Sequence, residues 1–132
     1  LSIDIETKGD QMTCFGVAPS PSEAIVVPLF IREKPIRHSW SEENEVRALQ
    51  WIRKICLLPN PKVGQNFLFD TRFLWERYGI PVANIADDTM LLHHALQPEM
   101  EKGLGFLASL YTNEASWKMM RSHALDTIKK ES

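Results

Sequence analysis

Two carboxylates lie near the start of the chain, separated by one apolar residue. Asp4 and Glu6 flank Ile5, and Ile3 precedes them. Successive side chains of a β-strand point to opposite faces, so a strand here would place both acids on one face and both isoleucines on the other. Adjacent carboxylates repel unless they are solvated or bridged by a cation, and their hard oxygen atoms suit Mg²⁺ or Mn²⁺. The pair is therefore either part of a divalent-metal site or the solvated acidic face of an edge strand.

A second polar group follows a short apolar segment in the middle of the chain. Asn66 and Asp70 are four residues apart, so they would share one face of a helix that begins near Asn66. The pair could contribute to a site at the end of that helix. Alternatively, Asn66 is a helix cap and Asp70 is a first-turn acid favoured by the helix dipole.

A third group precedes another apolar stretch. Asp87, Asp88 and Thr89 come directly before Met90-Leu91-Leu92. Aspartate is a preferred N-cap residue, so we expect Asp87 or Asp88 to cap a helix that runs to Leu96.

The elements that must position these groups begin with three strands. Alternating residues predict a strand over 1–6, and Gly9-Asp10 predicts a hairpin turn after it. Further strands are expected over 12–17 and 24–30. Short turns between consecutive strands favour an antiparallel meander.

Helices dominate the rest of the chain. We expect a charged loop over 31–40, which contains Pro35, and a helix that Ser41 caps and Pro59 ends. A short buried strand is expected at 62–64. Later helices are expected over 68–78, from Asp87 or Asp88 to 96, over 104–111 and over 116–130. This order predicts an α/β fold with a mixed sheet and helices packed on it.

Bulk composition limits how the chain could handle nucleic acid. The 132 residues carry a net charge of −2, and the pI is about 6.1. Binding through a basic face alone would normally need more positive charge, so bound cations or a partner domain would have to neutralise phosphate. Two isolated cysteines, Cys14 and Cys56, indicate a reducing, intracellular compartment. No apolar run approaches the ~20 residues of a membrane span.

Taken in order, these motifs resemble the proofreading 3′–5′ exonuclease domain of family A DNA polymerases, within the DEDD exonuclease superfamily. The resemblance covers residues 1 to about 112. It rests on the succession Asp4-x-Glu6, Val63-Gly64-Gln65-Asn66-x-x-x-Asp70, Asp88-Thr89-Met90 and Gly103-Leu104-x-x-Leu107-Ala108. The spacing from Val63 to Asp70 is its most specific part. The resemblance implies a ribonuclease H-like fold with a mixed central β-sheet flanked by helices.

The resemblance also implies roles for individual residues. Asp4 matches a carboxylate that bridges two divalent metal ions, Glu6 a ligand of the ion that activates water, and Asp70 the acid that serves the second ion. Thr7 and Asn66 match positions close to the terminal nucleotide. Phe67, Phe69 and Phe73 could stack on that nucleotide, or they could be core residues of a helix. Asp88 matches a structural acid at a helix start.

The third motif of this superfamily is a Tyr or His followed by an Asp on a late helix. His123 and Asp126 are the nearest match, but their i, i+3 spacing is shorter than the one the family uses. We therefore expect the motif to lie beyond Ser132 and the chain to be a single exonuclease domain, over 1–132, that is incomplete at both ends. Without the fourth acid, metal binding and activity of this chain should be weak.

The implied function is hydrolysis of the 3′-terminal phosphodiester of DNA with two Mg²⁺ or Mn²⁺ ions, next to a polymerase domain in cis. Two alternatives keep the fold. One is an inactive module that binds nucleic acid or braces a polymerase, and the other is an exonuclease that trims RNA. The missing segment could leave apolar surface uncovered, so self-association is a further expectation.

Overall fold

A computed structural model describes residues 1–31 and 35–114 of the chain. The expected helix over 116–130 lies outside the described residues. Contacts divide the chain into two compact units, residues 1–89 and residues 90–132, which are described separately below.

The first unit is built on a five-stranded mixed sheet. Its strands lie side by side in the order β3-β2-β1-β6-β7. Strands β1 and β2, and β2 and β3, pair antiparallel, whereas β6 is parallel to both β1 and β7. The bounds are Ser2–Lys8 for β1, Gln11–Ser20 for β2, Glu23–Pro28 for β3, Lys62–Gly64 for β6 and Ile85–Asp88 for β7. The predicted meander and the predicted mixed sheet are confirmed.

Two helices complete the first unit, and both were predicted. Helix α1 covers Glu42–Leu57, and the Ser41 hydroxyl accepts a hydrogen bond from the Asn44 amide at 3.3 Å, as expected of an N-cap. Helix α2 covers Phe67–Tyr78 and ends at Gly79, whose φ of 62° is the left-handed conformation that glycine adopts at helix ends.

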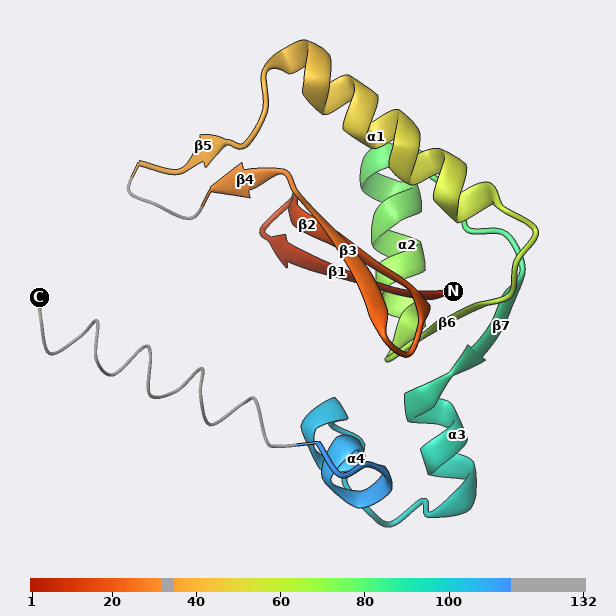
Figure 1. Cartoon of the computed structure of the whole chain (residues 1–132). Coiled ribbons are helices and arrows are strands. Elements are labelled where there is room, and N and C mark those ends of the chain that lie inside the picture. Colours follow the sequence, from red (N-terminus) through yellow and green to blue (C-terminus); the bar gives the residue numbers. More distant parts are fainter. Residues whose placement is uncertain (32–34, 115–132) are drawn as a thin grey trace, which may run out of the picture. The chain divides into compact units, whose positions relative to one another are not determined.

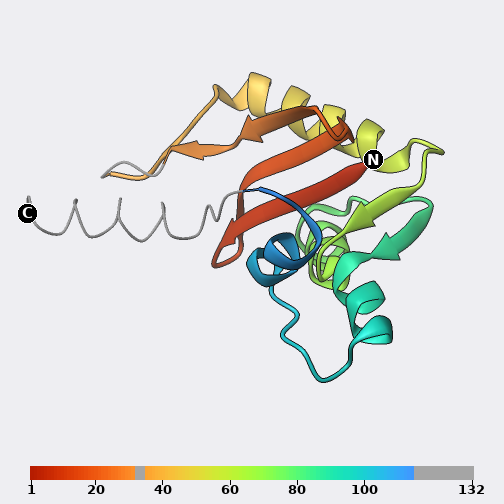
Figure 2. The same cartoon turned by 60° about the horizontal axis from the view of Figure 1, so that its bottom comes forward.

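Three short strands differ from the predicted elements. The segment that ends in Asp88 was expected to link two helices, but Ile85–Asp88 pairs with β6 as strand β7, and Figure 2 shows the two side by side. Its residues are exposed or half-buried, so no alternating apolar pattern marks it. Strand β4, Phe30–Ile31, begins at the last residue of the strand expected over 24–30, and it pairs with β5, Arg37–His38, which lies in the segment expected to be a loop. The Phe30 and His38 rings, 4.6 Å apart, support this small ribbon.

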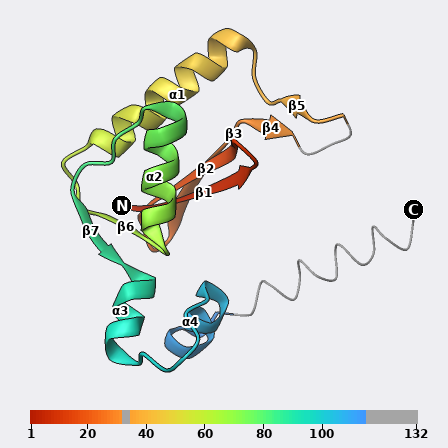
Figure 3. The ribbon, with the colours of Figure 1, turned by 180° about the vertical axis from the view of Figure 1, so that it is seen from behind.

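One face of the sheet carries the core. Ile3 lies opposite Val17 and Ile5 opposite Phe15, so the side chains of these four residues share a face, and all are buried. Both helices contribute to the same buried cluster, with Ile52 and Cys56 from α1, and Phe67 and Leu74 from α2. Figure 1 shows α2 behind β1 and β2, and Figure 3, from the opposite side, shows it in front of them. Helix α2 therefore covers one face of the strands that carry the first acidic pair.

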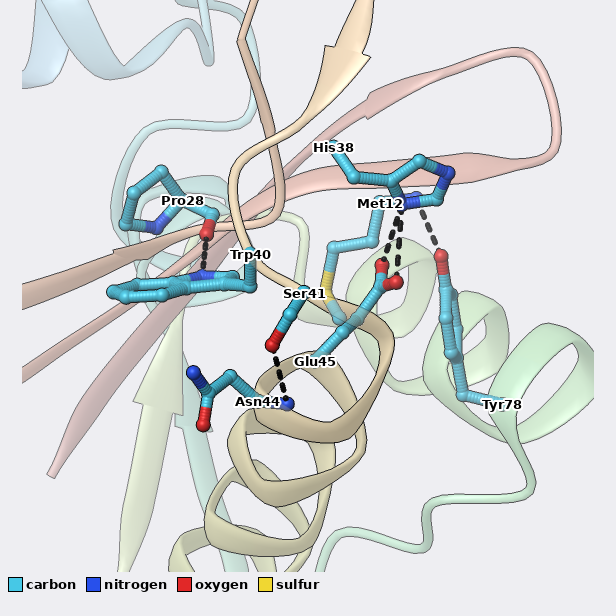
Figure 4. A network of polar contacts seen from close by, with 8 residues as sticks. All are labelled: Met12, Pro28, His38, Trp40, Ser41, Asn44, Glu45 and Tyr78. Carbon is cyan, nitrogen blue, oxygen red and sulfur yellow. Dashed lines mark hydrogen bonds and ion pairs between the residues drawn. The ribbon is translucent and has the colours of Figure 1, made fainter.

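Polar contacts fix the ends of the helices against the strands (Figure 4). The Met12 amide, at the start of β2, donates to the Tyr78 hydroxyl at 2.8 Å, which holds the last residue of α2. Before α1, the Trp40 indole N–H donates to the Pro28 carbonyl at 2.5 Å. These bonds connect residues far apart in the sequence, so they restrict how each helix is oriented on the sheet.

The second unit contains helix α3, Thr89–Leu96, whose first residue still belongs to the first unit, and helix α4, Leu104–Tyr111. Both were predicted. His93 is only 2% exposed, and its Nδ1 lies 2.9 Å from the Tyr111 hydroxyl. This bond joins the two helices. Across the described part of the chain, no helix is both long and apolar enough to cross a bilayer.

Candidate functional site

Strand β1 presents its two acids on the face opposite the core. Asp4 and Glu6 are exposed, whereas Ile3 and Ile5, at 1% and 6% exposure, are buried. The predicted alternation is therefore confirmed. On this face Asp4 lies opposite Gly16 and Glu6 opposite Cys14, so neither acid faces a basic residue in its paired position on β2.

Asp70 belongs to the buried side of α2. The buried residues of this helix are Phe67, Asp70 and Leu74, at the i, i+3, i+7 spacing of a core-facing stripe. Asp70 is only 4% exposed. A carboxylate in a stripe that normally holds apolar residues loses hydration, which is costly unless the charge is compensated or removed.

The electrostatics bring the three acids into one group. The pKa of Asp70 is raised to about 7, first by burial of the carboxyl and then by the charge of the nearby Asp4. A backbone hydrogen bond from Ile5, between the two acids of β1, lowers it, while Asp88 and Glu6 add smaller upward contributions. The first unit thus holds a cluster of interacting carboxylates that spans β1 and α2.

Asp4 is also affected by this crowding. Its pKa is raised by partial burial of the carboxyl and then by the charge of Glu6. The residue as a whole is exposed, so its burial is much less complete than that of Asp70. Repulsion by Glu6 acts in the same direction, so the upward shift does not depend on burial alone.

Asn66 occupies the N-cap position of α2 but does not cap it with its side chain. Its backbone is left-handed, with φ 52° and ψ 47°, and its side chain makes no cap hydrogen bond. Asp88 performs this role, because its carboxylate oxygens accept the amides of Asn66 at 2.9 Å and Phe67 at 2.7 Å. The expectation that Asn66 caps α2 is wrong. Asp87 or Asp88 was expected to cap the helix that runs to Leu96, whereas the Asp88 carboxylate accepts from amides at the start of α2.

The other residues predicted to lie near the substrate differ in exposure. Thr7 is half-buried in β1, just past a shift in register between Glu6 and Thr7, and Asn66 is exposed. Phe67 is 1% exposed and belongs to the core, so its ring offers no open face for a base to stack on. Phe69 is 50% exposed and contacts Phe73 with ring centroids 6.0 Å apart. Within this part of α2, Phe69 is therefore the more accessible aromatic side chain.

The candidate metal ligands do not form a closed coordination group as they lie. Within residues 1–31 and 35–114, no three His, Cys, Asp or Glu side chains form a group that could hold a metal ion. His123 and Asp126, the nearest match to the third motif, lie outside the described residues.

The chemistry of the donors nevertheless fits a divalent cation. Carboxylate oxygens are the ligands that Mg²⁺ and Mn²⁺ prefer. Burial and the neighbouring carboxylate charges both raise the pKa of Asp70, and a bound cation would act against both effects. The cluster can therefore attract a cation or take up a proton at neutral pH.

Sequence reasoning placed Asp4, Glu6 and Asp70 in neighbouring elements but missed the link from Asp88 to α2. Asp88 and Phe67 are 21 positions apart in the sequence, which hides this contact. No local pattern marks it, because Asp88 reaches the start of α2 only through the pairing of β7 with β6.

Comparison with known proteins agrees with the motifs and the fold. A family model described as 3′–5′ exonuclease matches residues 1–129, nearly the whole chain. No curated protein matches the chain significantly. The mixed sheet flanked by helices is consistent with the ribonuclease H-like fold of this family. The chain belongs to the 3′–5′ exonuclease family that includes the proofreading domain of family A DNA polymerases.

Proposed function

We propose that this domain removes nucleotides from the 3′ end of DNA with two divalent metal ions, as part of an intracellular DNA polymerase. The observation that carries the proposal is the shared electrostatics of Asp70 on α2 with Asp4 and Glu6 on β1. Membership of the exonuclease family supports a nucleic-acid substrate. We propose a single-stranded 3′ end as the form of the substrate.

Asp4, Glu6 and Asp70 are the residues that would hold the ions. Two bound divalent ions would supply a hydroxide near neutral pH and stabilise charge on the attacking and leaving oxygens. The residues themselves supply negative charge from two elements, one an exposed strand face and the other a buried helix stripe. Because Asp70 is buried, the carboxylate is held in place more firmly than an exposed side chain would be.

Thr7 and Asn66 are the described side chains that we propose to contact the terminal nucleotide. Both stand close in sequence to the acids, Thr7 one residue after Glu6 and Asn66 one helical turn before Asp70. Phe69 is a better stacking surface than Phe67, because half of it is exposed. Stacking of a base on an aromatic ring is largely independent of sequence, as removal of any terminal nucleotide requires.

The proposal is tested with the protein that the complete gene encodes. Changing Asp4→Ala should reduce Mn²⁺-dependent release of mononucleotides from a 3′-labelled single strand by more than about 100-fold, the scale of losing a preorganised electrostatic group. Asp87→Ala is the matched control, because Asp87 is an exposed aspartate on β7. The control should retain the parent rate.

Two results separate the possible outcomes. Undiminished release by Asp4→Ala would refute the assignment of the site. Faster degradation of a ribo-oligonucleotide than of the same deoxyribo-sequence would keep the site but identify RNA as the substrate.

A second candidate function is an inactive module that binds nucleic acid or braces a polymerase. One observation favours it, which is that the described acids form no group of three able to hold a metal ion as they lie. It predicts that the complete protein binds single-stranded DNA but releases no mononucleotides at any Mn²⁺ concentration. Measuring both properties on the same preparation decides between the two.

A further inference from the structure

We infer that Asp88 is a positioning residue that joins strand β7 to the first turn of α2 and thereby sets where α2 presents Asp70 to β1. This inference deepens the proposed function and rests on it for its importance to catalysis. Asp88 is not proposed as a metal ligand.

The first step is the unusual start of α2. The first amides of a helix have no acceptor inside the helix and need one from elsewhere. The residue at the N-cap, Asn66, has a left-handed backbone, and its side chain makes no cap hydrogen bond. A carboxylate from a different element therefore supplies the acceptor that the local sequence does not.

The second step is the geometry of that acceptor. The two Asp88 oxygens accept from two consecutive amides, Oδ1 from Asn66 at 2.9 Å and Oδ2 from Phe67 at 2.7 Å. Two bonds from one planar group restrict both the position and the direction of the helix start. Hydrogen bonds to a charged acceptor are also stronger than neutral ones. Asp88 therefore restrains the amino end of α2 more tightly than a single cap bond would.

The third step concerns the contacts that hold Asp88 itself in place. Asp88 pairs with Gly64 across the parallel β6 and β7 strands, and the next residue, Thr89, donates its hydroxyl to the Gly64 carbonyl at 3.2 Å. Asp88 and Thr89 are thus both tied to Gly64, the last residue of β6. Because Asp88 is held by the sheet, its carboxylate can fix the position of the helix relative to the sheet.

The fourth step connects the helix start with the candidate site. Asp70 follows Phe67 by three residues, so it lies less than one turn from the amides that Asp88 holds. Asp70 in turn receives a backbone hydrogen bond from Ile5, between Asp4 and Glu6. Movement at the start of α2 would shift the Asp70 carboxylate relative to β1.

The test measures amide hydrogen exchange in the 132-residue chain without metal or DNA. In the parent, the Asn66 and Phe67 amides should be protected. Asp88→Asn, which leaves one oxygen able to accept, should lower their protection about tenfold or more. The Ile5 amide should also exchange faster, because its contact with Asp70 loosens. Asp87→Asn removes the same charge one residue earlier and should change none of the three.

A change at Asn66 and Phe67 with no change at Ile5 would mean that Asp88 only caps α2, and the inference would be overturned. Rapid exchange of Asn66 and Phe67 in the parent would overturn it as well, even if Asp88→Asn failed to fold.

A second readout uses the complete protein. Asp88→Asn should raise the Mn²⁺ concentration for half-maximal mononucleotide release about tenfold, while the rate at saturating Mn²⁺ stays close to that of the parent. An unchanged Mn²⁺ dependence would also refute the positioning role. Full activity of Asp70→Asn would instead refute the proposed function, and the exchange results without metal would still stand.

Discussion

Asp70 combines two environments that are rarely found together, the buried stripe of a helix and the neighbourhood of other carboxylates. Burial removes the water that would stabilise its charge, and the charge of Asp4 then opposes ionisation further. The same two conditions make a carboxylate group receptive to a cation. The protonation state of this one residue should therefore be visible in the stability of the whole first unit.

Stability should fall as the pH rises, by an amount that depends on Asp70. Its pKa is raised from 3.8 to about 7 in the folded state, so between these values the folded protein binds more protons than the unfolded chain. The free energy of unfolding should thus decrease from about pH 4 to about pH 7 and then level off, by on the order of a few kcal/mol. Urea unfolding in excess chelator measures this.

Asp70→Asn is the variant that isolates this contribution. Asparagine has nearly the same shape and does not titrate, so the variant should gain stability over the parent at pH 8 and none at pH 4. A parent-minus-variant difference that stays constant with pH would contradict the prediction. Asp87→Asn, which changes an exposed acid, should leave the pH profile unchanged.

The turn between β6 and α2 is the element on which the candidate site depends most. Gly64 ends β6, and Phe67 begins α2 with its ring packed directly over Gly64. A Cβ added to Gly64 would lie 2.5 Å from Cγ and 2.9 Å from Cβ of Phe67. Phe67 is 1% exposed, so its ring is packed inside the core. The close approach of strand and helix therefore requires glycine here.

Gly64→Ala should destabilise the protein by about 1–3 kcal/mol, the cost of overpacking a core. The matched control is Gly103→Ala, because a Cβ at Gly103 meets nothing within 4 Å and the φ of Gly103 is −67°. Thermal unfolding of both variants checks the prediction. Equal stability of Gly64→Ala and Gly103→Ala would show that the turn adjusts at little cost.

At the level of elements, the sequence predicted what short-range patterns encode. The alternation of apolar and polar residues predicted which side chains of β1 are buried. Ser41 predicted the start of α1, and Gly79 predicted the end of α2. Strand β7 could not be recognised, because its side chains are exposed or half-buried and its stability comes from pairing beside β6. The Asp88 cap of α2 was missed for the same reason. It exists only once parallel pairing brings Asp88 to Gly64.

At the scale of the whole molecule, the net charge of −2 and the acidic cluster raise the same question, namely what compensates the negative charge of phosphate. A protein of this charge must compensate phosphate with something other than an excess of basic residues. Bound cations are the compensation that the sequence suggested. Asp4, Glu6 and Asp70 are the residues where we propose that they bind. If cations bind only to the folded state, their binding at this site would raise the free energy of unfolding of the whole chain.

Mn²⁺ should therefore stabilise the folded chain, and more strongly at pH 8 than at pH 5.5. Protons compete with metal for the carboxylates, and Asp70 is largely protonated below its pKa of about 7. At a tenfold excess over the dissociation constant, the gain in the free energy of unfolding is about 1.4 kcal/mol. Thermal unfolding with increasing Mn²⁺ measures it, and Asp70→Asn should lose most of the gain. An equal gain in the parent and in Asp70→Asn would place the cation elsewhere on the molecule.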